Sequence, residues 1–458
     1  MKAVSAVAPA MLALLGACAV QPAYQRPALD LPATWHNASG ADAPLPAMQP
    51  DWWTALGDPA VDRLVASGLA DNPTLAEAIA RVDQARAMAG VQDARRLPAI
   101  GATGNLGHSA ASGRGTTDQT SAGIGLSLGW ELDLWGRVRE SAAAARHRLD
   151  ARTADAEAAR LSIVGEIADT ALALRACNLV DAIRERDIAS REAELAIVRT
   201  RIDYGQAAPV EAASAQSNLA LARTEQVAQE ESCRRLVDAL VALCGVDAGT
   251  VEQLLTGDLP SPPPFAPALP ATVLLTHPAV VAAEREVAAR WSEIAVARAD
   301  RLPRIDLTAL LTGQWLRTLG SSDTQASGSI GAGLSVPLLD GGAGLANVRF
   351  AEAAYREALA RLVSTLRTTV REIEDALAAQ QSAAARIETS REALAAAQFT
   401  LTASEARLRF GAIASYEMEE ARRQFRLAQE SAITARADLA RAWVALVRRT
   451  GPGWSAGR

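Results

Sequence analysis

Two stretches of equal length decide the fold: residues 71–100, DNPTLAEAIARVDQARAMAGVQDARRLPAI, and residues 276–305, THPAVVAAEREVAARWSEIAVARADRLPRI. They align without a gap and end in the same Arg-Leu-Pro-x-Ile signature. Two further matches follow in the same order: WELDLWG at 130–136 with VPLLDGG at 336–342, and RIDYG at 201–205 with RLRFG at 407–411. This spacing is far too long for a solenoid repeat and indicates a duplicated half.

Each half predicts the same succession of elements. A helix comes first, over residues 58–96 and 273–301, and a proline (Pro98 or Pro303) ends it. Alternating apolar residues then predict strands with one apolar face. The clearest strands are 124–130, 305–311 and 330–336, and polar loops are expected around 109–120 and 317–328.

Long helices resume at residues 137 and 343 and extend to 204 and 410. Apolar residues at three- and four-residue spacing, such as Leu161, Val164, Ala168 and Leu172, are typical of a coiled-coil seam. Helices of this size are roughly 100 Å long, more than a domain core needs. Return helices are expected up to Cys244 and over 415–449, and Pro-rich extended segments over 19–50 and 246–272.

Four strands with apolar faces, and no second layer to cover them, suit a membrane, where only a closed barrel satisfies every strand edge. A barrel needs about eight strands, so one chain cannot close it. Three chains would supply about twelve strands and leave an open lumen. The sequence therefore predicts an α+β membrane protein: a tandem-repeat protomer with four barrel strands and long coiled-coil helices, forming a trimeric β-barrel continued by an α-helical barrel.

The N-terminus predicts a lipoprotein. Lys2 precedes an apolar run from Ala6 to Leu15, and Leu15-Gly16-Ala17-Cys18 reads as a lipobox in which Cys18 is lipidated. The alternative is ordinary cleavage near Ala17, with Cys18 incidental. Ala19 offers no acidic inner-membrane retention signal, so we expect a lipid-anchored protein of the outer membrane that extends into the periplasm. The expected organisation is a signal peptide (1–17), a lipidated extended segment (18–57), the first repeat (58–245), a Pro-rich linker or equatorial segment (246–272), the second repeat (273–450) and a tail (451–458).

Composition argues against an enzyme. The net charge of −6 gives no basic surface for nucleic acid. The four histidines are scattered without metal-ligand spacing, and neither a phosphate-binding loop nor a nucleophile elbow is present. We expect no catalytic residue, cofactor or resident metal.

The cysteines predict one crosslink. Cys177 lies 28 residues before Gly205, and Cys233 lies 28 residues after it. In an antiparallel helix pair that turns at Gly205, equal separations place the two side by side, so we expect a disulfide; two buried thiols are the alternative. Cys244 has no evident partner.

The chain resembles the TolC-like outer-membrane efflux family, and most closely its lipoprotein branch. The resemblance covers nearly the whole mature chain. It departs at Thr276-His277-Pro278-Ala279, where the family usually shows an Arg-Pro-Asp run. The matching pieces are the lipobox, Tyr24-x-Arg26-Pro27, Trp52-Trp53-x-x-x-Gly57-Asp58-Pro59, the tract 72–85, residues 130–137, Pro337-Leu338-Leu339-Asp340-Gly341-Gly342 and Gly451-Pro452-Gly453-Trp454.

This resemblance implies a homotrimeric exit duct of a tripartite efflux system, passively conducting drugs or other small molecules from the periplasm to the exterior. Its partners would be a periplasmic adaptor protein, outer-membrane lipid and, indirectly, an inner-membrane pump. The turns at Gly205 and Gly411, each preceded by an arginine (Arg201 and Arg407), would be the tips that dock on the adaptor. Simple capping of the helix ends also explains these residues.

The resemblance also implies a constriction. Counted from Gly411, Glu417 and Glu420 match two aspartates that ring the periplasmic gate in this family. The first repeat has Glu211 and Ser214 at the corresponding positions. Rings of carboxylates would favour cations. A solvated acidic first helical turn is the alternative.

Other classes fit less well. A periplasmic adaptor lipoprotein would carry one hairpin inside compact β-domains, and a lipid-anchored hydrolase a compact domain with a catalytic acid. The outer-membrane component of a type I protein secretion system remains an alternative. The sequence does not name the transported substrate.

Overall fold

The computed structural model describes residues 20–38, 51–111, 117–264, 270–318 and 321–451. It divides into two compact units. Of the described residues, the first unit combines those within 20–29, 79–154 and 281–365 and contains the sheet; the second combines those within 30–78, 155–280 and 366–451 and contains two helical hairpins. Cys18 lies outside the described residues.

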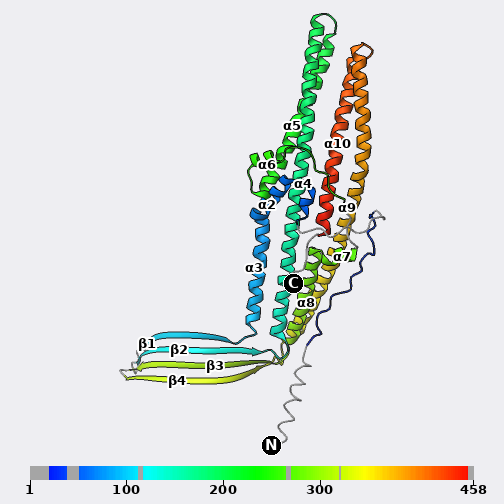
Figure 1. Cartoon of the computed structure of the whole chain (residues 1–458). Helices are drawn as coiled ribbons and strands as arrows, with labels where there is room; N and C mark the ends of the chain where they lie inside the picture. Colours follow the sequence, from blue (N-terminus) through cyan, green and yellow to red (C-terminus); the bar gives the residue numbers. More distant parts are fainter. Residues whose placement is uncertain (1–19, 39–50, 112–116, 265–269, 319–320, 452–458) are drawn as a thin grey trace. The chain divides into compact units, whose positions relative to one another are not determined.

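The order of elements repeats, as the sequence predicts (Figure 1). A short 3₁₀ helix, η1 (Trp52–Leu56), precedes the first repeat, and a short helix, α6 (Ala248–Leu254), follows it. The first repeat is α2 (Pro59–Asp71), α3 (Pro73–Ala94), β1 (Ala99–Ala111), β2 (Thr117–Leu132), α4 (Arg137–Asp203) and α5 (Pro209–Cys244). The second is α7 (Pro270–Thr276), α8 (Pro278–Ala299), β3 (Arg304–Thr318), β4 (Ser321–Ser335), α9 (Ala343–Arg409) and α10 (Ser415–Thr450).

The first helix of each repeat is in fact two helices, so the prediction of one continuous helix over 58–96 is wrong. Asn72 has an extended backbone, and its side chain accepts a hydrogen bond from Thr74 N at 2.9 Å. Asn72 precedes Pro73, whose ring disfavours helical conformation in the preceding residue. His277 likewise separates α7 from α8 and precedes Pro278.

The four strands form one antiparallel sheet in the order β1-β2-β3-β4, and β2–β3 pairing joins the two repeats. One row across the sheet, listed from β1 to β4, is apolar throughout: Ile100, Leu128, Ala309 and Ile330. The next row is small or polar except for one leucine: Gly101, Ser127, Leu310 and Ser329. Alternating rows point to opposite faces, so one face is apolar.

The strands are longer than predicted. The stretch expected to be a polar loop at 317–328 is mostly strand, because β3 continues to Thr318 and β4 begins at Ser321. The serines and threonines there pair across the sheet; Thr312 and Ser327, for example, share a hydrogen bond of 2.8 Å. Cross-strand hydroxyl pairs stabilise strands even where apolar alternation is absent.

The second unit contains the main hydrophobic core, which forms where α2, α6 and the bases of the hairpins meet. Trp52 packs against Trp443 of α10 with ring centroids 5.9 Å apart. Asp58 caps α2 and accepts a hydrogen bond of 2.8 Å from Arg175 of α4, and both side chains are buried. The Gly57-Asp58-Pro59 sequence therefore fixes the start of α2 against α4.

The segment 246–272 is not extended throughout, contrary to the prediction, because it contains α6 and the start of α7. Asp247 caps α6 by accepting a hydrogen bond from Thr250 N at 3.0 Å. A capping Asp can start a short helix within a Pro-rich segment.

Among the described helices, none is long and apolar enough to cross a membrane.

Candidate channel constriction and hairpin tips

The two hairpin turns have the same backbone geometry. Gly205 and Gly411 both have φ of 67°, in the left-handed region that glycine adopts most readily. Gln206 N donates to Arg201 O at 2.7 Å, and Ala412 N donates to Arg407 O at 2.9 Å. Among the described residues, none beyond the two chain neighbours has an atom within 4 Å of where a Cβ would stand on either glycine. The backbone angle, and not crowding, therefore requires glycine here.

The tips also present aromatic side chains to solvent. Tyr204 is 77% exposed and Phe410 is 88% exposed, each immediately before its turn glycine. Arg201 donates back to Gln206 O at 3.2 Å and so completes the first turn. The predicted tip residues thus lie together at each turn, beside an aromatic side chain that the described residues leave exposed.

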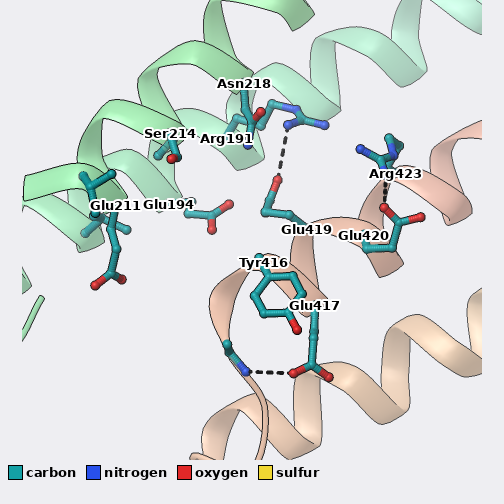
Figure 2. A pocket seen from close by; sticks show the side chains of 14 residues that line it. Arg191, Glu194, Glu211, Ser214, Asn218, Tyr416, Glu417, Glu419, Glu420 and Arg423 are labelled. Carbon is teal, nitrogen blue, oxygen red and sulfur yellow. Dashed lines mark hydrogen bonds and ion pairs between the residues drawn. The ribbon is translucent and has the colours of Figure 1, made fainter. Parts of the chain in front are cut away.

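The predicted gate residues line one cavity of about 800 Å³ between the two hairpins (Figure 2). Glu417 and Glu420 reach it from α10, and Glu211 and Ser214 reach it from α5. The corresponding positions of the two repeats are therefore close in space. Glu417 accepts a hydrogen bond from Ala414 N, and Glu420 pairs with Arg423, so both acids also have local partners.

A second pair of acids in this cavity was not predicted. Arg422 Nη1 donates to Glu194 Oε2 and to Glu419 Oε1, both at 2.9 Å. Arg191 Nη1 donates to Glu419 Oε2 at 3.2 Å. Glu194 and Glu419 thus meet around shared guanidinium groups, and they join α4 of the first hairpin to α10 of the second.

The two acids have opposite pKa shifts. Burial, together with a hydrogen bond to Glu419, raises the pKa of Glu194 to about 8. Burial also acts to raise the pKa of Glu419, but the hydrogen bond from Glu194 and the charges of Arg422 and Arg191 lower it overall. Near neutral pH, Glu194 is therefore protonated and donates a hydrogen bond to the ionised Glu419 carboxylate.

These contacts form the tip end of an inter-hairpin ladder, defined here as four contacts between an arginine and a carboxyl group that join α4 to α10. The α4 numbers fall as the α10 numbers rise, as expected for antiparallel helices. All the side chains concerned are 11–27% exposed. The rungs are Glu194–Arg422 (2.9 Å), Arg191–Glu419 (3.2 Å), Asp187–Arg426 (3.7 Å) and Arg184–Glu430 (3.3 Å).

The ladder has a sequence signal. Arg184, Asp187, Arg191 and Glu194 follow one another at three- or four-residue spacing on one helix, as do Glu419, Arg422, Arg426 and Glu430 on the other. Charges of both signs on one helical face usually indicate a solvent-exposed surface. Only their spatial partners distinguish an inter-helix ladder from a solvated stripe.

The first hairpin carries a covalent link. Cys177 and Cys233 form a disulfide with their Cα atoms 5.6 Å apart. By the offset between the turn glycines, Ala383 and Leu439 occupy the corresponding positions of the second hairpin, so that hairpin has no such link there. Cys244 is a buried free thiol, and burial raises its pKa to about 11.

Among the described residues, no cluster of three or more His, Cys, Asp or Glu could hold a metal ion.

A duplicated sheet-and-hairpin protomer of this kind defines a channel protein of the outer membrane. The chain belongs to the outer membrane efflux protein family, whose model matches residues 64–246 and 269–452. It is thus the outer-membrane component of an efflux system. The two matched stretches correspond to the two repeats.

Individual relatives cover the chain almost completely. It is 30% identical over 461 aligned residues to the outer membrane protein OprJ of Pseudomonas aeruginosa, covering 97% of this chain and 95% of the relative. It is 26% identical to the solvent efflux pump outer membrane protein SrpC of Pseudomonas putida, with 97% of each chain covered. The Campylobacter jejuni CmeC outer membrane channel has the same fold, with a TM-score of 0.85, 21% identity and 96% of each chain covered.

Proposed function

We propose that three copies of this chain form an exit duct that conducts small molecules passively from the periplasm to the exterior. The sheet carries this proposal. The described part of the protomer leaves its apolar side chains exposed: Ile330 is 92% exposed, and Ile100 and Leu106 are also exposed. β1 and β4 are its edge strands. Pairing β4 of one copy with β1 of the next would satisfy both edges and turn the apolar face to lipid.

The hairpins would continue the duct into the periplasm. α4 and α9 each have 67 residues, which corresponds to roughly 100 Å of helix. We propose that the cavity lined by Glu417, Glu420 and Glu211 forms the constriction, with three copies of each acid around the axis. The inter-hairpin ladder would hold the closed form, because opening requires the two hairpins to separate.

The tips would meet the periplasmic adaptor of a tripartite pump. The turns at Gly205 and Gly411 are matched in backbone conformation and present exposed Tyr204 and Phe410. Exposed aromatic side chains beside arginines are typical of protein-binding surfaces. The adaptor, and through it an inner-membrane pump, would supply selectivity and energy, so no catalytic residue or cofactor is needed here.

The N-terminal segment would place a lipid anchor on Cys18. Residues 21–24 of this segment contact α8 in the first unit. Gln21 Nε2 donates to Trp291 O at 2.9 Å, and Trp291 Nε1 donates to Pro22 O at 3.1 Å. Tyr24 Oη donates to buried Glu284 at 2.8 Å. A segment that leads to a lipid must lie on the outer surface of the duct.

Native mass spectrometry of detergent-solubilised protein tests the assembly. The account predicts three copies, with a lipid adduct on the peptide that begins at Cys18. A monomer that stays monomeric in outer-membrane lipid nanodiscs would contradict it, because its sheet edges would then remain unpaired.

A further inference from the structure

The two repeats meet each other within one chain, and all of this contact lies in the first unit. β2 of the first repeat pairs with β3 of the second. Next to the sheet, Arg148 of α4 forms an ion pair with Glu293 of α8. Ala144 of α4 and Val296 of α8 line one cavity together with these two residues. We call this set of contacts the repeat–repeat interface.

The corresponding positions of α3 and α9 are exposed. α3 begins at residue 73 and α8 at residue 278, an offset of 205; α4 begins at residue 137 and α9 at residue 343, an offset of 206. Val296 therefore corresponds to Val91 of α3, and Ala144 corresponds to Phe350 of α9. Ala144 is buried, whereas Val91 is 50% exposed and Phe350 is 73% exposed. The described part of the chain thus leaves open on α9 a face that α4 has buried.

The ion pair of the repeat–repeat interface is replaced as a pair. By the same offsets, Arg148 corresponds to Ala354, and Glu293 corresponds to Met88. A contact that keeps one charge and loses the other is destabilised, whereas exchange of both charged residues for apolar ones is tolerated. Met88 is also exposed. This is the pattern expected if Ala354 of one copy lies opposite Met88 of the next.

The sheet edges can pair in the same way. Within the chain, Gly129 of β2 pairs with Thr308 of β3. The paired strands of the two repeats correspond at the same two offsets, 205 from β1 to β3 and 206 from β2 to β4. Gly129 therefore corresponds to Ser335 of β4, and Thr308 corresponds to Thr103 of β1. An equivalent pairing between copies would place Ser335 opposite Thr103 of the next copy.

This register also keeps the two faces of the sheet continuous. It places Ile330 of β4 opposite His108 of the next copy. Ile330 lies in the apolar row that begins with Ile100, and His108 is on the same face of β1 as Ile100. Ser335 and Thr103 both lie on the other face. A shift by one residue would set the apolar face of one copy beside the polar face of the next.

We infer that neighbouring copies meet by repeating the repeat–repeat interface. β4 pairs with β1 of the next copy in the register that sets Ser335 opposite Thr103. Phe350 of α9 packs against Met88 and Val91 of α3 in the next copy. The inference rests on the proposed three-copy duct, to which it adds the strand register and an aromatic anchor. Aromatic side chains in such grooves are typical of the residues that carry most of the binding energy at an interface.

Cysteine crosslinking of the full-length protein, purified from outer membranes, tests the register. The test variant is Ser335→Cys with Thr103→Cys, oxidised with copper phenanthroline. The matched control is Ser335→Cys with Asn105→Cys, because Asn105 lies on the same face of β1, two residues further along. β2 and β3 separate β1 from β4 within one chain, so a crosslink joins different copies. The unsubstituted chain controls for the native cysteines.

We expect covalent dimers and trimers on non-reducing gels in the test variant, formed about fivefold or more faster than in the control, because directly opposite residues are closer than diagonal ones. Faster crosslinking of the control would show another register and overturn the inference. Native mass spectrometry separates the two proposals. A trimer without either crosslink would overturn the register and leave the duct standing, whereas a monomer would overturn both.

Phe350→Ala tests the helical contact. Its trimer should dissociate on dilution in detergent at a concentration about tenfold or more above that of the wild type. Phe410→Ala is the matched control, because Phe410 is also exposed but lies at a hairpin tip outside the first unit. Phe350 is exposed in the protomer, so the helix content of its variant should be unchanged by circular dichroism. Equal dissociation of the two variants would overturn the aromatic anchor.

Discussion

Arg422 of α10 lies 2.9 Å from the Glu194 carboxyl of α4, and this contact is one of four that tie the second helical hairpin to the first. The same guanidinium contacts Glu419, and both acids lie in the cavity that we propose as the constriction. The first prediction concerns this contact.

Arg422→Gln should loosen the two hairpins. It leaves two half-buried acids without their shared cation, which we expect to destabilise the protein by about 1–3 kcal/mol. Chemical unfolding in detergent measures the loss. Arg391→Gln is the control, because Arg391 forms an exposed pair with Glu388 on α9 and should cost little. Equal stability of Arg422→Gln and the control would contradict a structural role for the ladder.

Glu194 should make stability fall as pH rises from 7 to 9. Its pKa is about 8 in the folded protein, against an ordinary value of 4.5, so in this window only the folded state holds the proton. The stability that this proton provides is lost as pH rises through 8, by roughly 1 kcal/mol. Glu419 has a lowered pKa and stays ionised throughout.

Unfolding of the wild type and of Glu194→Gln at pH 7, 8 and 9 checks this slope. The substitution should flatten it, whereas Glu388→Gln, at an exposed site, should leave it unchanged. A slope that persists in Glu194→Gln would assign the effect to other groups.

Reduction of the disulfide should weaken the first hairpin. Cys177 and Cys233 are 56 residues apart in sequence, and a loop of that size corresponds to about 4 kcal/mol in the chain-entropy description. We expect a loss of about 2–4 kcal/mol in Cys177→Ala with Cys233→Ala. Cys244→Ala controls for removal of a thiol. Reductant should lower the stability of this variant as much as it lowers that of the wild type, because both keep the disulfide. Two free thiols, found by peptide mass spectrometry of unreduced periplasm-derived protein, would refute the crosslink.

The turn glycines should resist substitution. Alanine at Gly205 or Gly411 must adopt a left-handed φ, which costs roughly 1–2 kcal/mol. Gly90→Ala is the matched control: this glycine lies in α3 with open space around it, and alanine there should be neutral or stabilising. Melting temperatures compare the three variants, and equal melting temperatures would mean that the tips tolerate another conformation.

The duplicated fold could be predicted because its repeated motifs and turn glycines are visible in a single sequence. The shared Arg-Leu-Pro-x-Ile signature sets the repeat, and Gly205 and Gly411 end the long helices at the expected positions. The sequence analysis did not predict the helix break at Asn72, although Pro73 disfavours a helical conformation in the residue before it. The strand extensions through Thr312 and Ser327 were missed because their side chains lack apolar alternation.

The candidate site was predictable only in part. Glu417 and Glu420 stand at fixed positions after a turn glycine, so counting from the turn finds them. The pKa shifts of Glu194 and Glu419 arise from burial and from the contact between the two side chains. The two residues are 225 positions apart in the sequence, so the sequence alone does not indicate this contact.

Single-channel recording in planar bilayers tests the central claim most directly. Purified wild-type trimer is compared with Glu417→Gln combined with Glu420→Gln, and with Glu388→Gln combined with Glu392→Gln on α9 as a charge-matched control. The account predicts small, cation-selective currents in the wild type and the control, and altered conductance and weaker cation selectivity in the gate variant. A protein that gives no channel current in any form would contradict the duct, and currents indifferent to Glu417 and Glu420 would place the constriction elsewhere.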